Sequence, residues 1–369
     1  MKLCDLSLQQ FRNMEQLHFE PSPFLNVIFG QNGQGKTNLL ESIWLLTGGK
    51  SFRGGKDAEL IQKGAEFAKI EAAVLADSKE EQDTLQLLIA KSKTAQNRAA
   101  RSMGKNGSSR QRPAQLAGIF PAVVFAPNHL TLVKGSPDGR RRFLDAALCQ
   151  LYPGYLENLR RYTRLITQKN ALLKQEICPG DDMLEAFDRQ LATAGSLLIE
   201  KRIEYIQAVS VFAQNCYRDL SAGREALTLF YEPSVPDGQD AEAFLKTLHE
   251  ARRKDRLAGF ATAGPHRDDL LLQLDGEDAK VWASQGQQRS VVLALKIAEA
   301  SRIEQVTEET PVLLLDDVLS ELDAARQDFL LNRIEKKQVF VTSCETDLFT
   351  KTEGRLFRME QGKGTLYQT

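Results

Sequence analysis

The feature that most constrains the fold of this sequence is an apolar segment, residues 25–29, that leads directly into a glycine-rich turn and then a helical pattern. The turn has the spacing G-x-x-x-x-G-K-T, in which glycines allow backbone N–H groups to surround phosphate oxygens. In such a loop Lys36 reaches the β- and γ-phosphates of a nucleotide, and the Thr37 hydroxyl is a ligand for Mg²⁺. A chance match is disfavoured because the flanking residues predict the strand, loop and helix that the motif requires. The sequence therefore predicts a phosphate site formed by Gly30, Gln31, Asn32, Gly33, Gln34, Gly35, Lys36 and Thr37.

The composition is that of a globular chain with room for two lobes. Of its 369 residues, 42% are hydrophobic and 26% are charged. The net charge is −1, so a polyanionic partner would have to bind to local basic patches. The five cysteines lack C-x-x-C pairing and no signal-peptide pattern is present, which predicts reduced core thiols in the cytoplasm. No apolar run approaches the roughly 20 residues that span a bilayer, so no membrane partner is expected.

Two β-hairpins and a basic run are predicted in the first third of the chain. Residues 6–19 and 68–89 alternate as hairpins do. In the first turn, Arg12 and Asn13 either reach the nucleotide or face solvent. Residues 91–112 contain no acidic residue, and such a run stays mobile unless a polyanion neutralises it. The candidate DNA contacts, with a solvated surface as the alternative, are Arg98, Arg101, Lys105, Arg110 and Arg112.

A helical lobe is predicted in the middle of the chain. Ser136 and Pro137 are helix-start signals, and apolar residues at helical spacing continue to residue 220 with a break at Pro179 and Gly180. The polar faces carry three arginine clusters, each typical of a solvated surface but together favouring a polyanion. The candidate DNA contacts in this lobe are Arg140, Arg141, Arg160, Arg161, Arg164, Arg252 and Arg253.

Strands are predicted to return after residue 226. Residues 270–274 alternate up to a turn at Asp275 and Gly276, and we expect them to pair with residues 280–282. Residues 264–269, just before this segment, form a polar turn rich in charge. Its charged side chains either have a function or only hold the turn.

The last third of the chain contains two further features of a nucleotide site. Residues 283–289 form a polar turn directly before an apolar helix, whose N-terminus is a second potential phosphate site. Residues 311–315 predict a buried parallel strand that ends in Asp316 and Asp317. Asp316 is suited to hold Mg²⁺ and Asp317 to orient or deprotonate a water, although such a pair could also cap a helix. A last buried strand is predicted at residues 338–343.

In this order, these parts resemble the ABC-type ATPases. The resemblance implies an α/β fold: an ABC-type ATPase head, with a mixed sheet and an antiparallel β subdomain, plus an inserted α-helical lobe. The implied domains are the N-terminal part of the ATPase lobe at residues 1–130, a mainly helical lobe at 131–256, and the C-terminal part of the ATPase lobe at 257–369. The resemblance also implies ATP and Mg²⁺ as cofactors and a homodimer that forms on ATP binding. In that dimer Ser284, Gly286 and Gln287 of one copy, the signature turn, would complete the site of the other.

Six motifs make the chain resemble one family in particular, the RecF family of bacterial DNA replication and repair ATPases. They lie at residues 11–13, 33–41, 133–145, 264–269, 284–289 and 315–323. The resemblance implies a weak, DNA-dependent ATPase with Lys36, Asp316, Asp317 and Ser284 as catalytic residues. It further implies a clamp on duplex DNA or single-/double-strand junctions, work with RecO and RecR and indirectly RecA, and a part in the SOS response.

Two positions depart from the patterns of these ATPases. Asn128 stands where a glutamine or an acidic residue is common, and the closing strand carries Thr342 and Ser343 instead of a histidine. Both departures are consistent with slow or differently triggered hydrolysis. A nucleotide contact by Asn128 remains part of the predicted site.

A second hypothesis is an ATP-gated head that recruits protein partners without binding DNA. The near-neutral net charge favours it, whereas the arginine clusters and the acid-free run disfavour it. Salt-sensitive DNA retention that requires ATP would separate the two hypotheses.

Overall fold

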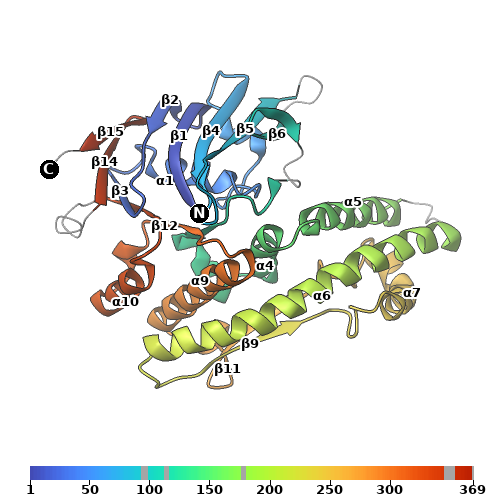
Figure 1. The fold of residues 1–369 in the computed structure, drawn as a ribbon. Helices are drawn as coiled ribbons and strands as arrows, with labels where there is room; N and C mark the ends of the chain where they lie inside the picture. Colours follow the sequence, from blue (N-terminus) through green and yellow to red (C-terminus); the bar gives the residue numbers. More distant parts are fainter. Residues whose placement is uncertain (93–98, 112–115, 176–179, 345–353, 368–369) are drawn as a thin grey trace. The chain divides into compact units, whose positions relative to one another are not determined.

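The structure is a computed structural model that describes residues 1–92, 99–111, 116–175, 180–344 and 354–367 (Figure 1). The chain divides into two compact units. Unit 1 comprises Met1–His129 and Leu295–Thr369, and unit 2 comprises Leu130–Ala294. Unit 2 therefore extends past residue 256 and includes both the polar turn at residues 264–269 and the signature turn.

Unit 1 contains a mixed sheet that carries the phosphate loop. Its strand order within the described residues is β15-β14-β3-β13-β12-β8, parallel throughout except for the β14–β15 hairpin. The central strands are almost continuously apolar and buried, as parallel strands covered on both faces are. The strands are β3 Leu25–Phe29, β8 Ala122–Phe125, β12 Val312–Asp316, β13 Val339–Ser343, β14 Gly354–Glu360 and β15 Lys363–Tyr367.

A second sheet of unit 1 is antiparallel, with the order β2-β1-β4-β5-β6-β7 among the described residues. It confirms the two hairpins predicted from the alternating segments, with Leu8 paired to Leu17 and Ile70 to Leu87. Together the two sheets confirm the predicted mixed sheet with an antiparallel subdomain. The strands are β1 Lys2–Phe11, β2 Met14–Phe19, β4 Phe67–Leu75, β5 Asp83–Lys91, β6 Ala99–Lys105 and β7 Ser108–Gln111.

We expected residues 91–112 to stay mobile unless a polyanion neutralised them, but their described part forms strands within the sheet. Residues 99–105 and 108–111 are strands, and β6 pairs with β5 along its whole length. Basic side chains in this run are neutralised by acidic residues from elsewhere in the sequence, since Lys105 lies 3.0 Å from Asp83. A backbone ladder and such ion pairs order a strand whose own sequence carries one sign of charge.

The helices of unit 1 flank these strands. Helix α1 begins at the phosphate loop and is buried along most of its length. The helical elements are α1 Lys36–Leu45, α10 Ala324–Ile334, the C-terminal part of α9 Gln285–Thr307, and the 3₁₀ segments η1 Asp57–Leu60, η2 Pro127–Leu130 and η3 Leu319–Glu321.

Unit 2 confirms the predicted helical lobe. Its longest helix, α6, runs along β9 and packs against α5 and α7 (Figure 1). Gly180 of the predicted break directly precedes α6, whereas Pro179 lies outside the described residues. The helices are α3 Thr131–Lys134, α4 Pro137–Leu151, α5 Tyr155–Leu173, α6 Asp181–Leu220, α7 Ala241–Ala258, α8 Ala279–Trp282 and the start of α9, and the strands are β9 Leu227–Glu232, β10 Asp269–Leu274 and β11 Glu277–Asp278. Among the described residues, no helix has both the length and the apolar character that crossing a membrane requires.

The predicted pairing of residues 270–274 with residues 280–282 was wrong. Strand β10 pairs instead with β9 and with the two-residue β11, and residues 279–282 form α8. The Asp278 carboxylate accepts a hydrogen bond from the Lys280 N–H, which is an N-cap that starts this helical turn. The cap therefore ends the strand before Lys280.

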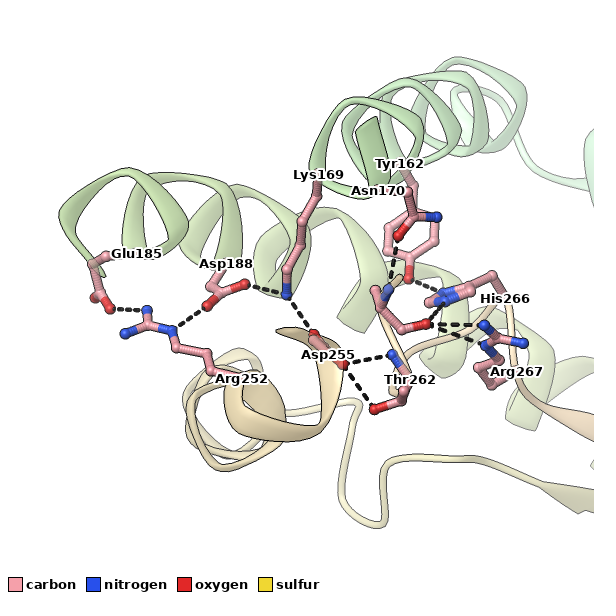
Figure 2. A network of polar contacts seen from close by, with 11 residues as sticks. Tyr162, Lys169, Asn170, Glu185, Asp188, Arg252, Asp255, Thr262, His266 and Arg267 are labelled. Carbon is pink, nitrogen blue, oxygen red and sulfur yellow. Dashed lines mark hydrogen bonds and ion pairs between the residues drawn. The ribbon is translucent and has the colours of Figure 1, made fainter. Parts of the chain in front are cut away.

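A network of buried charges holds α5, α6 and α7 together (Figure 2). The Lys169 ammonium on α5 lies 2.8 Å from Asp188 on α6 and 3.0 Å from Asp255 on α7. Lys169 and both carboxylates are completely or almost completely buried. Arg252 extends the network from α7 by pairing with Asp188 and Glu185. Every charge in this cluster is thus paired, which a buried charge requires.

The same network fixes the polar segment that follows α7. The second oxygen of Asp255 accepts bonds from the N–H and hydroxyl of Thr262, each 2.8 Å long. Burial lowers the pKa of His266 to about 4, so its ring is neutral. The ring lies 2.7 Å from the Tyr162 hydroxyl and 3.1 Å from the carbonyl of Ala261 (Figure 2). The polar turn at residues 264–269 is therefore held by partly buried hydrogen bonds to Tyr162 of α5 and to the segment that follows α7.

We expect Lys169→Met to destabilise the protein strongly. Removal of the ammonium leaves Asp188 and Asp255 without their shared buried cation, which costs about 3–5 kcal/mol of the free energy of unfolding. Urea denaturation would measure the loss. As a matched control, Lys201→Met removes a partly exposed pair with Glu204 on α6 and should cost about 0.5 kcal/mol. Equal effects of the two variants would contradict the role of the buried triad.

Candidate nucleotide-binding site

The phosphate loop connects the end of β3 to the start of α1, as the motif predicts. Gly35 has φ 109° and precedes the first residue of α1. A Cβ on Gly35 would lie 3.0 Å from the side-chain amide of Asn13, so both the backbone conformation and the space favour glycine. The loop is therefore formed against the turn of the β1–β2 hairpin.

The ammonium of Lys36 lies against the loop. It donates hydrogen bonds to the carbonyl oxygens of Gly30 and, at 3.2 Å, Gln31, and it lies 3.3 Å from Sγ of Cys344. The side chain is 7% exposed. A positive charge held against a loop of this motif is suited to bind phosphate oxygens.

Cys344 corrects one part of the cysteine expectation. In the described part of the chain, Cys4, Cys149, Cys216 and Cys344 are free thiols. Cys344 is exposed, however, and its thiol lies 3.2 Å from the Asn32 side-chain oxygen at the phosphate loop. It is not a core thiol. Cys178 lies outside the described residues.

The acidic strand end meets the phosphate-loop helix directly. The Thr37 hydroxyl donates a hydrogen bond of 2.8 Å to Oδ1 of Asp316 at the end of β12. The two residues predicted as Mg²⁺ ligands are thus in contact, although they are far apart in the sequence. Both offer hard oxygen donors, and Mg²⁺ favours one or two such protein ligands together with phosphate oxygens and water. The donor set therefore fits Mg²⁺.

Burial raises the pKa of the Asp316 carboxyl, and the nearby charge of Asp317 raises it further. Hydrogen bonds from Thr37 and Thr342 and the charge of Arg53 act in the opposite direction. A buried carboxylate near a second one favours a cation beside it. The electrostatics of the strand end therefore also fit a Mg²⁺ site.

Thr342, at the end of β13, links the two acidic residues. Its hydroxyl donates to Oδ1 of Asp316 at 3.0 Å and accepts a bond of 2.8 Å from the backbone N–H of Asp317. The hydroxyls at this strand end are visible in the sequence, but their contacts are not. The parallel register that places Thr342 beside Asp316 was the missing information.

Asp317 has a left-handed backbone, with φ 53°, that turns the chain away from β12. The Ser320 hydroxyl contacts it twice, at 2.8 Å from its carbonyl oxygen and 3.2 Å from its carboxylate. The carboxylate is half-buried next to the phosphate-loop contact of Asp316. This position suits a group that orients a water, a role that remains a prediction.

Arg12, Asn13 and Asn128 have defined positions in unit 1. The Arg12 guanidinium forms two bonds, of 2.8 and 2.9 Å, with the buried carboxylate of Glu41 on α1. Asn13 donates to the carbonyl of Gln34 in the phosphate loop, and Asn128 donates to the carbonyl of Phe52. Arg12 thus ties the hairpin turn to α1. Glu41 belongs to the motif at residues 33–41, but the sequence did not show that its carboxylate is buried against Arg12.

The signature turn lies in unit 2 at the start of α9. Ser284 precedes the helix, and its Oγ accepts a bond of 3.3 Å from the N–H of Gln287. The side-chain oxygen of Gln287 accepts a bond of 2.7 Å from the N–H of Ser284. These reciprocal bonds form a capping box, which fixes the N-terminus of the helix.

The candidate DNA contacts fall into two groups. Arg101, Arg140 and Arg252 are largely buried and form ion pairs with Asp57, Asp269 and Asp188 respectively. Arg141 donates to the Asp268 carbonyl. Exposed side chains are those of Arg160, Arg161, Arg164 and Arg253. Arg98 and Arg112 lie outside the described residues, and the side chain of Arg110 is not described.

The phosphate loop, the acidic strand end and the mixed sheet define an ATPase head of the RecF/RecN/SMC class. The chain matches the family described as RecF/RecN/SMC N terminal domain over residues 2–366. The DNA replication and repair protein RecF of Agathobacter rectalis is 38% identical over 368 residues, which cover 98% of each chain. That of Heliobacterium modesticaldum is 40% identical over 376 residues, again 98% of each chain.

Solved structures similar to this one point to the same family. The structure of the recombination mediator protein RecF-ATP in the RecFOR pathway is 30% identical, with a TM-score of 0.89 over 100% of this chain and 98% of that one. An SMC head bound to the C-winged helix domain of ScpA shares the fold, with 16% identity, a TM-score of 0.56 and coverage of 100% and 97%. The chain therefore belongs to the RecF family.

We expect Thr342→Val to destabilise unit 1 by about 1–3 kcal/mol, because it leaves the Asp317 N–H without its acceptor and removes a donor to the buried Asp316. Thr342→Ser keeps the hydroxyl and should lose about 1 kcal/mol or less for the missing methyl group. Chemical denaturation would measure both. A valine variant as stable as the serine variant would contradict the bridging role.

Proposed function

We propose that this chain is an ATP-dependent DNA-binding protein of replication and recombinational repair. The observation that carries the proposal is the contact of Thr37 with Asp316, which joins the phosphate loop to the acidic strand end. The relatives of this chain, which are DNA replication and repair proteins RecF, support the biological role. The solved RecF-ATP structure supports ATP as the nucleotide.

The site residues have distinct roles in this proposal. Lys36 and the N–H groups of the loop bind the β- and γ-phosphates. Thr37 and Asp316 hold Mg²⁺, which when bound neutralises part of the phosphate charge. Asp317 orients the attacking water. Arg12 and Asn13 hold the loop in shape through Glu41 and Gln34.

The signature turn has its role in a second copy of the chain. Ser284, Gly286 and Gln287 present a hydroxyl, a glycine backbone and a helix N-terminus, all of which suit an anionic oxygen. In the proposed head-to-head dimer this turn binds the γ-phosphate held by the partner copy. ATP therefore stabilises the dimer, and hydrolysis releases it.

Hydrolysis is proposed to be slow and to depend on DNA. Asn128 lacks the charge of an acidic residue, and Thr342 cannot titrate as a histidine does. The proposed cofactors supply positioning and charge neutralisation, and Asp317 is the carboxylate that we assign to act on the water. Slow turnover suits a clamp that must persist on DNA.

We assign the DNA contacts to the exposed arginines of unit 2. Arg160, Arg161 and Arg164 lie on the exposed side of α5, whereas Arg140 and Arg252 already neutralise Asp269 and Asp188. Guanidinium groups that face solvent can bind phosphates of duplex DNA or of a single-/double-strand junction. The internal pairs of Arg101, Arg140 and Arg252 instead hold the fold.

The proposed partners act on the same DNA. The RecFOR pathway named for the solved RecF structures supports RecO and RecR as partners. Through them the protein helps to load RecA at gaps and supports the SOS response. We place this work in the cytoplasm.

We expect ATP, but not ADP, to convert the protein into dimers that sediment with a short DNA duplex. Lys36→Met should bind ATP at least tenfold more weakly because the phosphates lose their cation. Ser284→Arg should retain ATP as a monomer but fail to dimerise. Analytical ultracentrifugation with labelled DNA compares the wild type, Lys36→Met and Ser284→Arg. Dimers that ignore DNA at low salt would instead favour the protein-recruiting head.

We expect replacement of Arg160, Arg161 and Arg164 by alanine to weaken DNA binding and its salt dependence. Three lost phosphate contacts should lower the slope of log K against log [salt] by about 3. The matched variant with three lysines keeps the charge and should retain most of the slope. DNA titrations at several salt concentrations measure it. An unchanged slope in the alanine variant would exclude this face of α5 from the DNA site.

A further inference from the structure

We infer that Glu225, a residue outside every motif of the site, positions the signature turn for the γ-phosphate of a second copy. The inference deepens the proposed head-to-head dimer and rests on it for its functional meaning. Glu225 lies in the loop between α6 and β9 and is half-buried. Its carboxylate accepts a hydrogen bond of 2.6 Å from the side-chain nitrogen of Gln287.

The chemistry of the partners fixes the orientation of the Gln287 amide. The Ser284 N–H can only donate, so it must face the amide oxygen, at 2.7 Å. The Glu225 carboxylate can only accept, so it must face the amide nitrogen, at 2.6 Å. Rotation of the amide by half a turn would break both bonds. Glu225 therefore fixes the orientation of the Gln287 amide and so stabilises the capping box.

Glu225 is itself held on its other side. Its second oxygen accepts a bond of 2.7 Å from the hydroxyl of Tyr217, which is buried in α6. The next residue, Ala226, exchanges two bonds with Asp275 at the end of β10, of 2.8 and 2.9 Å. The carboxylate thus connects the signature turn to the longest helix of unit 2 and to the three-stranded sheet.

This arrangement prepares the turn for an anion. The Ser284 hydroxyl accepts the N–H of Gln287, so its own proton is available to donate to a phosphate oxygen. The negative charge of Glu225 is directed at two donors, Gln287 and Tyr217, instead of at the ligand. Because the donors are held in place before binding, little ordering is required when the partner's nucleotide arrives. Glu225 is a positioning residue that touches no reacting atom.

The test compares Glu225→Ala, Glu225→Gln and Tyr217→Phe in the full chain. Hydrogen–deuterium exchange without nucleotide reports the order of the turn itself, and sedimentation equilibrium with ATP reports the dimer. Glu204→Ala is the matched control, since Glu204 is a glutamate of α6 that pairs only with Lys201 in the described structure. Affinity for a fluorescent ATP analogue at low protein concentration tests the phosphate loop separately.

We expect Glu225→Ala to speed exchange at Ser284 and Gln287 and to weaken the ATP dimer, each by about five- to tenfold. Glu225→Gln keeps an acceptor for Gln287 and should restore most of both. Tyr217→Phe should give a smaller change of the same sign, and Glu204→Ala none. Nucleotide affinity of the monomer should stay unchanged in every variant.

Unchanged exchange and an unchanged dimer in Glu225→Ala would overturn the inference. Loss of thermal stability without either change would also overturn it, since that result indicates a structural role alone. Failure of the wild-type chain to dimerise with ATP has a different meaning. It would overturn the proposed dimer and the functional part of this inference, while the exchange data would still show whether Glu225 holds the turn.

Discussion

The hydrogen bonds around Asp316 are the contact on which the rest of unit 1 depends. They join the first turn of α1, the end of β12 and the end of β13 through Thr37 and Thr342. Each of these segments is buried, and each would expose polar groups to an apolar core if it shifted by one residue. The same few bonds therefore link the register of β12 against β13 to the placement of the phosphate loop. This explains how a site formed from residues far apart in sequence keeps a fixed geometry.

The parts of the fold that sequence predicted are those encoded by local patterns. The phosphate loop, the buried strand that ends at Asp316 and the two hairpins depend on glycine spacing and on alternation, which neighbouring residues fully determine. The failures have a different origin. Residues 280–282 alternate like a strand, but the Asp278 carboxylate starts a helical turn there. The described part of the acid-free run pairs with β5 as a strand, and Asp83 on that adjacent strand neutralises Lys105. The sequence of one strand does not identify the strand that pairs with it or the charges that this partner carries.

The arginine clusters illustrate the same limit for the candidate site. Arg140 and Arg160 are equally basic in the sequence and lie in similar helical patterns. The structure distinguishes them, because Arg140 is buried against Asp269 whereas Arg160 is exposed. An ion pair of this kind joins residues that are distant in the chain. The sequence therefore shows the arginine but not the acidic residue with which it pairs. Charge clusters therefore predict the presence of basic surface better than they predict which residue belongs to it.

The signature turn shows that a motif can be complete in sequence and still depend on residues outside it. Ser284 and Gln287 can form a capping box in any helix that begins with this pattern. A capping box alone leaves the second hydrogen-bonding group of Gln287 in solvent, free to exchange partners. Glu225 and Tyr217 remove that freedom. If a partner's phosphate is to be recognised by a hydroxyl and a backbone N–H, their directions matter more than their identity. Binding of a phosphate by the signature turn should therefore require a hydrogen-bond acceptor at residue 225 in addition to the motif itself.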